Sequence, residues 1–233
     1  MKFFFLLIIS NFTECGTRAK LPNIRIIGGS LSLESSWPEA AYFLFTYSAN
    51  VPNSNEVINY SSFCGGTIIN RRHVLTAAHC IPSKLEYKHM TIPVTINSYY
   101  KTYESMIKVY LAVYNRSLIS KTASKNTFTV QKLIKHENYD ASRLLNDIAI
   151  LRLNEDVKFN SEIQAACLPE NKSSNYPLTD TEAYVIGWGQ TEFGNSSAYL
   201  KNAKIKIFDS NKCSNVSTGI TKRWDTQICA VSF

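Results

Sequence analysis

The sequence is poor in glycine and contains no low-complexity segment, no internal repeat and no block of like charges. Glycine accounts for 9 of 233 residues, about 4% against a typical ~7%. The 25 Lys and Arg and the 18 Asp and Glu give a formal net charge of +7. Because these charges are spread along the chain, they argue against a nucleic-acid-binding arm. A 45% share of hydrophobic residues is enough for a sizeable core at this length, which excludes a disordered chain.

The chain also lacks Cys-x-x-Cys pairs, the usual spacing of zinc ligands. Its cysteines form an even set, which fits disulfides in an oxidising compartment. Six cysteines allow 15 pairings, so their spacing alone leaves the connectivity open. No metal site and no cofactor are predicted. The cysteines are Cys15, Cys64, Cys80, Cys167, Cys213 and Cys229.

No hydrophobic run reaches the ~20 residues that a membrane-spanning helix needs. At the N-terminus, Met1-Lys2 is followed by seven apolar residues, Phe3–Ile9. This pattern predicts a secretory signal peptide at 1–13, with Ser10 or Thr13 at the cut, rather than a short buried segment. We therefore expect a secreted, extracellular protein with no membrane anchor. Six Asn-x-Ser/Thr sequons agree with a secreted glycoprotein, and they begin at Asn11, Asn59, Asn115, Asn171, Asn195 and Asn215.

Short segments rich in β-branched and aromatic residues are separated by Asn, Ser, Gly or Pro, which predicts an all-β fold. Phe128–Ile134 and Lys204–Ile207 alternate apolar and polar residues, as strands with one buried face do. A helix is expected to begin only near Asp209 or Ser210. No linker divides the chain. Lys204–Ile207 is part of a predicted strand at 203–208, and the other predicted strands are 42–45, 63–69, 148–153 and 183–188.

Three segments carry groups suited to chemistry. In Val74-Leu-Thr-Ala-Ala-His79-Cys80, small neighbours leave the imidazole room, and a disulfide at the next residue would fix the backbone. Asp147 enters an apolar strand, where an unpaired carboxylate is costly, so it needs a partner such as a histidine N–H. Arg25 precedes Ile26-Ile-Gly-Gly29, and a trypsin-like enzyme that cuts after Arg25 would free Ile26 as a new N-terminus.

With further motifs in the same order, the chain resembles a chymotrypsin/trypsin-family serine endopeptidase in zymogen form. The motifs are Ile26-Ile-Gly-Gly29, Trp37-Pro38, Cys64-Gly-Gly-Thr-Ile68, Thr76-Ala-Ala-His-Cys80, Asp147-Ile-Ala-Ile-Leu151, Cys167-Leu-Pro169 and Gly187-Trp-Gly189. The resemblance implies a general base at His79, with Asp147 holding its tautomer. It implies residues 14–25 as a propeptide and 26–233 as the protease domain. The other histidines, His73, His89 and His136, are expected to be structural.

The resemblance also implies the fold, the disulfides and the partners. The fold is a trypsin-like double β-barrel whose first barrel is complete and whose second lacks its last strands. The pairs are Cys64–Cys80, Cys213–Cys229 and Cys15–Cys167, the last of which keeps the propeptide tethered after activation. The partners are protein or peptide substrates, a trypsin-like activating protease and serine protease inhibitors, with no nucleic acid.

The nucleophile of the family is not found in these residues. The family's spacing from His to Asp is about 45 and from Asp to Ser about 93. His79 and Asp147 lie further apart, which predicts an insertion of about 23 residues within 83–126. The same spacing places the serine near position 240, and no Gly-Asp-Ser-Gly-Gly occurs in residues 1–233. We therefore expect a truncated domain that is inactive by itself.

Two other functions remain open. A catalytically dead homologue could act as a secreted binding or decoy protein, although an open second barrel would expose unpaired strand edges. The presence of both His79 and Asp147 favours an active enzyme over a catalytically dead homologue. Glycosaminoglycan or membrane-surface binding through basic charge is poorly supported, because the positive excess of residues 26–233 is modest and forms no cluster.

Overall fold

The computed structural model of the chain describes residues 15–16, 30–119, 125–169, 179–191, 194–214, 223–224 and 226–232. The predicted signal peptide, the Arg25–Ile26 cleavage site and the sequons at Asn11, Asn171 and Asn215 lie outside the described residues. Within these ranges, no helix has the length and apolar character needed to cross a bilayer.

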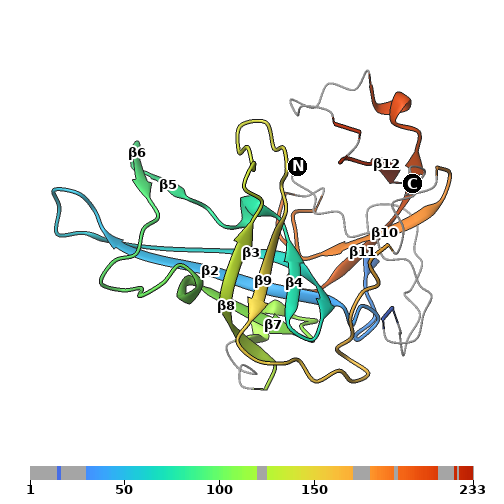
Figure 1. Cartoon of the computed structure of the whole chain (residues 1–233), viewed down its shortest axis with the longest axis horizontal. Coiled ribbons are helices and arrows are strands. Elements are labelled where there is room, and N and C mark those ends of the chain that lie inside the picture. The colour runs from blue at the N-terminus through green and yellow to red at the C-terminus, as the bar shows by residue number, and fades with distance from the viewer. Residues whose placement is uncertain are drawn as a thin grey trace.

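Six antiparallel strands close into a barrel in the order β2-β3-β4-β9-β8-β7 (Figure 1). The closed barrel confirms the predicted all-β class and the first barrel of the trypsin-like fold. The strand bounds are β2 Ala40–Asn50, β3 Val57–Asn70, β4 His73–Thr76, β7 Ile107–Leu111, β8 Thr127–Lys135 and β9 Ala149–Leu153.

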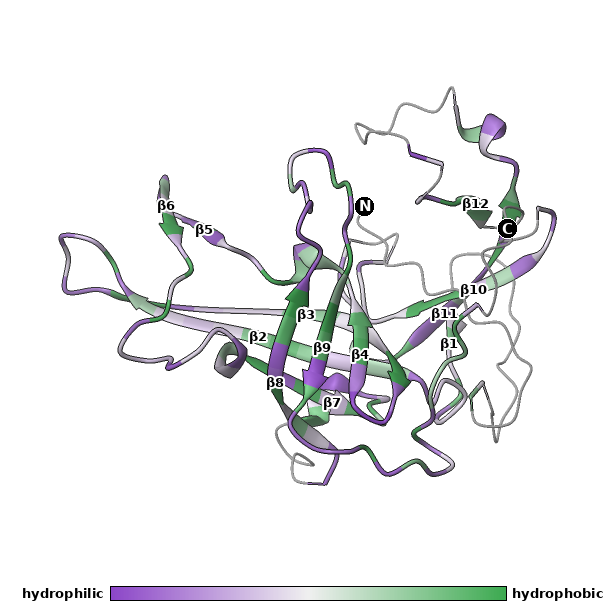
Figure 2. Cartoon of the chain, viewed as in Figure 1, coloured by the Kyte–Doolittle hydropathy of each residue, from purple (hydrophilic) through white to green (hydrophobic). Residues whose placement is uncertain are grey.

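Alternating side chains give this barrel its core. In β2, Phe43 and Phe45 are fully buried, whereas Thr46 is exposed. In β8, Phe128 and Val130 are buried and Leu133 packs against the same core, whereas Thr129, Gln131 and Lys132 are exposed. Figure 2 shows hydrophobic and hydrophilic residues alternating along the barrel strands. Because successive side chains of a strand point to opposite faces, one face of each strand packs inward, and each buried aromatic ring contributes about 1.5–3 kcal/mol.

A second sheet lies beside the barrel and contains β1 Ser30–Leu31, β10 Glu182–Gly187, β11 Lys201–Phe208 and β12 Cys229–Ser232. Within the described residues, β11 pairs with each of the other three strands. An aromatic cluster that includes Tyr42 of β2 and Trp188, next to β10, joins the sheet to the barrel. Their rings meet edge to face, with centroids 5.4 Å apart. That further strands of a second barrel are missing stays a prediction.

The predicted insertion forms a hairpin of β5 Lys84–Tyr87 and β6 Met90–Pro93, followed by the short helix η2 Glu104–Met106. It packs against the outer part of the β2–β3 hairpin, which extends beyond the barrel in Figure 1. The other short helices are η1 Ala78–Cys80, η3 Arg116–Leu118 and η4 Ser210–Cys213.

Each of the six predicted strand segments coincides with a strand, and η4 begins at the predicted place. The Asp209 side chain caps η4 by accepting the backbone N–H of Asn211 at 2.8 Å. Sequence reasoning missed β1, β4, β5, β6, β7 and β12, most of which are short.

Gly66 allows β3 and β4 to approach each other closely. A Cβ added there would lie 2.7 Å from Cγ1 of Val74 and 3.0 Å from the carbonyl oxygen of Leu75. Gly66→Ala is therefore expected to lower the free energy of unfolding by about 1–3 kcal/mol, as overpacking does, measured by urea denaturation. Gly65→Ala is the matched control, because a Cβ there meets nothing within 4 Å. Equal losses of unfolding free energy in the two variants would contradict the close approach of β3 and β4 at Gly66.

Candidate active site

Strand pairing brings the predicted histidine and aspartate together. Thr76, the last residue of β4, pairs with Ala149, the first residue of β9. His79 follows one strand end by three residues and Asp147 precedes the other by two. Buried Ala77 and Ala78 lead into η1, which carries His79. Their small side chains let this turn pack against the barrel, so the two residues meet at its rim.

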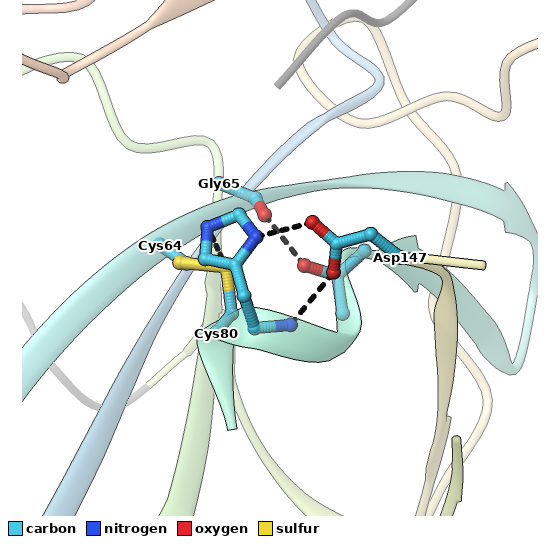
Figure 3. The surroundings of a disulfide bond; sticks show 6 residues. Cys64, Gly65, Cys80 and Asp147 are labelled. Atoms are coloured by element: carbon cyan, nitrogen blue, oxygen red, sulfur yellow. Dashed lines mark hydrogen bonds and ion pairs between the residues drawn. A yellow bond between two sulfur atoms is a disulfide. The ribbon is translucent and has the colours of Figure 1, made fainter. Parts of the chain in front are cut away.

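The Asp147 carboxylate holds His79 through two hydrogen bonds (Figure 3). Oδ2 of Asp147 lies 2.6 Å from Nδ1 of the imidazole, and Oδ1 accepts the backbone N–H of His79 at 2.8 Å. The side chains are 21% and 22% exposed, so one edge of the imidazole is accessible. Two contacts from one carboxylate fix both the ring and its backbone, which leaves Nε2 as the nitrogen available for proton transfer.

Burial acts to raise the pKa of the Asp147 carboxyl, but hydrogen bonds from His79 and from the backbone of Ala78 outweigh it. The pKa of Asp147 therefore lies below its usual range. Asp147 is an anion at neutral pH, as a group that orients an imidazole and stabilises an imidazolium must be.

The Cys64–Cys80 disulfide lies on the other side of the imidazole (Figure 3) and ties η1 to β3. Nε2 of His79 is 3.7 Å from Sγ of Cys80. The ligand atoms of Cys64, His79 and Cys80 lie within 4.8 Å of one another, but both sulfurs belong to the disulfide. Since thiolates are the form of cysteine that binds metals, this oxidised cluster is suited to rigidity rather than to metal binding.

The loop between β8 and β9 places Asp147 through hydrogen bonds at its base. Asn146 has a φ of 54°, a left-handed conformation that asparagine tolerates better than most residues. Its side-chain amide donates to the carbonyl of Asn138 at 2.8 Å. The backbone N–H of His136 donates to the carbonyl of Ile148 at 3.1 Å. These contacts make Asn146 a positioning residue for Asp147, which sequence reasoning missed.

Lys135 and Tyr139 lie near the His79–Asp147 pair and were also missed. Nζ of Lys135 donates to the carbonyl of Ile81 at 2.8 Å and lies 5.5 Å from the centre of the Tyr139 ring. Burial lowers the pKa of Lys135, and the negative charge of Asp147 opposes that effect. Burial, with the charges of Asp147 and Asp140, raises the pKa of Tyr139 to about 12. Tyr139 therefore stays protonated at neutral pH, and the hydrogen bond from Lys135 to Ile81 supports the turn that carries His79.

Among the described residues, no side chain of the three other histidines is hydrogen-bonded to His79 or Asp147. Nδ1 of His73 is 2.9 Å from Oδ1 of Asn70 in the turn before β4. His89 occupies the β5–β6 turn with a φ of 64°. His136 is exposed and accepts the backbone N–H of Asn138. These features are local, and the structural role of the three histidines stays a prediction.

The structure also contains the other two disulfides that the resemblance implies. Cys213 of η4 is bonded to Cys229 of β12. Cys15 is bonded to Cys167, and the neighbouring Gly16 N–H donates to the carbonyl of Ala165 at 2.8 Å. Cys15 and Gly16 are thereby attached to the segment that follows β9.

The three described sequons differ in exposure. Asn59 and Asn195 are exposed, as glycan acceptors need to be. Asn115 is half-buried, and its Oδ1 caps η3 by accepting the backbone N–H of Ser117 at 3.0 Å. Asn59 and Asn195 are therefore better placed than Asn115 to carry a glycan.

Comparisons with known proteins agree with this geometry. The family model described as Trypsin matches residues 38–232. Chymotrypsin-C of Mus musculus is 29% identical over 229 residues, which cover 96% of this chain and 72% of that protein. The proclotting enzyme of Tachypleus tridentatus is 32% identical over 151 residues, 64% of this chain and 37% of that enzyme.

A solved structure described as "Structure of GrC" superposes with a TM-score of 0.63 at 25% sequence identity, covering 88% of this chain and 75% of that one. The family match spans most of the chain and includes both His79 and Asp147. The chain therefore belongs to the chymotrypsin/trypsin family of serine proteases.

Proposed function

We propose that the chain supplies the general base and the orienting acid of a secreted serine endopeptidase. The observation that carries this proposal is the Asp147–His79 pair, in which one carboxylate binds both Nδ1 and the backbone N–H of the histidine. With Nδ1–H held by Asp147, Nε2 takes the proton of a serine hydroxyl as that oxygen attacks the scissile carbonyl. It then gives the proton to the leaving amine.

The nucleophile has to come from outside residues 1–233, since these contain no Gly-Asp-Ser-Gly-Gly. We expect it to follow Phe233 in the protein. The backbone oxyanion hole beside the serine would come with it. Removing a triad member leaves ~10³–10⁴-fold catalysis over water only because the oxyanion hole and substrate binding persist. Without them, residues 1–233 have no source of rate enhancement.

The purified 233-residue chain is accordingly expected to hydrolyse no peptide substrate and to take up no fluorophosphonate probe. Incubation of the chain with the fluorophosphonate probe, followed by peptide mapping of any labelled residue, tests this expectation. A mapped serine adduct within residues 1–233 would overturn the proposal. The transcript sequence downstream of codon 233 separates the alternatives: an in-frame Asp-Ser-Gly-Gly supports the endopeptidase, and an immediate stop codon supports a catalytically dead binding or decoy protein.

Activation is proposed to occur by cleavage between Arg25 and Ile26 by a trypsin-like protease. The Cys15–Cys167 disulfide supports a propeptide of residues 14–25 that stays attached after this cut. Secretion after removal of residues 1–13 agrees with the disulfides and with exposed sequons at Asn59 and Asn195. Protein or peptide substrates and serine protease inhibitors are the expected partners.

A further inference from the structure

A cleft of about 330 Å³ lies where the barrel meets the second sheet. Tyr110 of β7 and Tyr114, three residues after β7, line it from the barrel, Glu34 lines it from the segment after β1, and Tyr199 from the segment before β11. The proposed catalytic pair is not among its lining residues. We call this feature the Glu34 cleft.

Hydrogen bonds between distant segments hold the walls of the Glu34 cleft in place. The carbonyl of Leu200 accepts both the backbone N–H and the hydroxyl of Ser32, at 3.0 and 2.9 Å. The N–H of Leu200 donates to the carbonyl of Tyr114 at 2.8 Å. These bonds tie the segment that leads to Glu34, the segment that carries Tyr199 and the turn after β7 to one another, so the cleft is formed before a ligand arrives.

The turn after β7 carries backbone strain at the cleft. Ala112 lines the cleft and has a φ of 54°, a left-handed conformation that is costly for a residue with a Cβ. The preceding residue, Leu111, fixes the turn by donating its N–H to the carbonyl of Asn126 at 3.0 Å. Such strain persists only where the surrounding structure enforces it, and it is found most often at binding and catalytic sites.

Tyrosine rings form much of the cleft wall. The rings of Tyr114 and Tyr199 have centroids 5.4 Å apart and are tilted by 59°. Tyr110 and Tyr114 are half-buried, whereas Tyr199 is 41% exposed, so the cleft is open to solvent on one side. The face of an aromatic ring carries negative electrostatic potential and attracts a cation within about 6 Å of its centre.

Carboxylates without ion-pair partners accompany these rings. Glu34 is exposed, and among the described residues its carboxylate has neither an ion pair nor a hydrogen bond. A smaller adjoining cleft shares Glu34 and Tyr114 and adds Glu162, whose carboxylate is likewise unpaired in the part of the chain that the structure describes. By contrast, Glu56 and Glu182 each bind a lysine. In a chain of net charge +7, the cleft is therefore a locally negative, aromatic surface.

Cations next to the cleft in sequence do not neutralise it. Nε of Arg116 donates to the carbonyl of Ser197 at 2.7 Å, and its guanidinium lies 4.4 Å from the centre of the Phe63 ring. Lys125 is exposed and is not a lining residue. The negative charge of Glu34 thus remains available to a cation from outside the chain.

We propose that the Glu34 cleft binds an arginine side chain of another polypeptide, with the guanidinium against the tyrosine rings and paired with the Glu34 carboxylate. A guanidinium is planar, weakly hydrated and able to stack on an aromatic ring while it binds a carboxylate through two N–H groups, which a lysine ammonium does not do. The volume is at the lower end for a ligand site and suits one side chain. The open side at Tyr199 leaves room for the main chain that carries the arginine.

Two blocked amino acids test this proposal on the wild-type chain. N-acetyl-arginine N-methylamide is expected to shift the backbone amide resonances of Ala112, Val113 and Tyr114 in a ¹H–¹⁵N NMR titration of the 233-residue chain. The citrulline analogue has the same shape without the charge, so it is expected to bind at least about tenfold more weakly. A blocked Gly-Arg-Gly peptide is expected to bind at least as tightly as the single blocked arginine.

Variants of two exposed lining residues separate charge from aromatic character. Glu34→Gln is expected to weaken arginine binding about tenfold. Glu155→Gln, at an exposed glutamate outside the cleft, is the matched control and should leave binding unchanged. Tyr199→Leu is expected to weaken binding about threefold, the effect of one exposed cation–π contact. Tyr199→Phe keeps the ring and should bind as the wild-type chain does.

Several results would overturn the proposal. They are equal affinities for the arginine and citrulline compounds, arginine-induced shifts outside the cleft only, equal binding by Glu34→Gln and Glu155→Gln, or failure of the Gly-Arg-Gly peptide to bind. Tighter binding of blocked lysine, tetramethylammonium or Ca²⁺ at the same amides would assign the cleft to another cation and also overturn it. Because the ligand comparison needs no variant and no nucleophile, these outcomes are independent of whether the extended protein cleaves peptide bonds.

Discussion

Asp147→Asn is expected to lower kcat about 10⁴-fold in the activated protein that carries the proposed serine. The carboxylate accepts both the ring N–H and the backbone N–H of His79. An amide that still accepts the backbone N–H turns its own N–H donors toward Nδ1. The imidazole is then held with Nδ1 as an acceptor and the proton on Nε2, so that Nε2 no longer takes a proton from serine.

The matched control for this prediction is Asp156→Asn. Asp156 also forms an ion pair, with Nε of Arg72 at 2.6 Å, but its side chain is 66% exposed. This pair lies at the ends of β4 and β9 opposite to those that carry His79 and Asp147. Exposed pairs contribute about 0–1 kcal/mol to stability, so this variant should retain kcat. Steady-state kinetics on a peptide substrate measures kcat for both variants. A loss below about tenfold in Asp147→Asn would refute the orienting role of Asp147.

The all-β class and the His79–Asp147 pair could be predicted because their signals are local, whereas the barrel architecture followed from the family resemblance. β8 and β11 alternate apolar and polar residues, and the segments around His79 and Asp147 carry family motifs. The disulfides could not be derived from spacing, since six cysteines allow 15 pairings. They followed only from the resemblance.

The extension of the β2–β3 hairpin could not be predicted because its support comes from a distant segment. Ser48 and Asn59 are polar residues typical of a turn, yet they lie opposite each other in the ladder. The β5–β6 hairpin buries Ile58 from more than 20 positions away. Sequence reasoning located the insertion but not the surface that it covers.

Lys135 and Tyr139 were missed for a similar reason. The stretch His136-Glu-Asn-Tyr139 has the composition of a surface loop. Only packing places the Tyr139 ring next to Lys135 and near Asp147. Asn146 gave a usable signal, because asparagine is enriched at left-handed positions, and it directly precedes Asp147.

Phe43→Ala is expected to lower the free energy of unfolding by about 3–5 kcal/mol. Phe43 is fully buried on the inner face of β2. It pairs in register with Cys64 of β3 on one side and Val109 of β7 on the other. Deleting the ring leaves a cavity between strands of a closed barrel, which collapses poorly because each strand is hydrogen-bonded to two neighbours.

Urea denaturation of the 233-residue chain measures this loss. Thr46→Ala is the control on the same strand, since its exposed side chain should change stability by no more than about 0.5 kcal/mol. Below the unfolding transition, the exchange of the His79 backbone amide should be unchanged, because Asp147 holds it from the rim rather than from the core. A loss under about 1 kcal/mol would contradict the assignment of Phe43 to a tightly packed core inside the closed barrel.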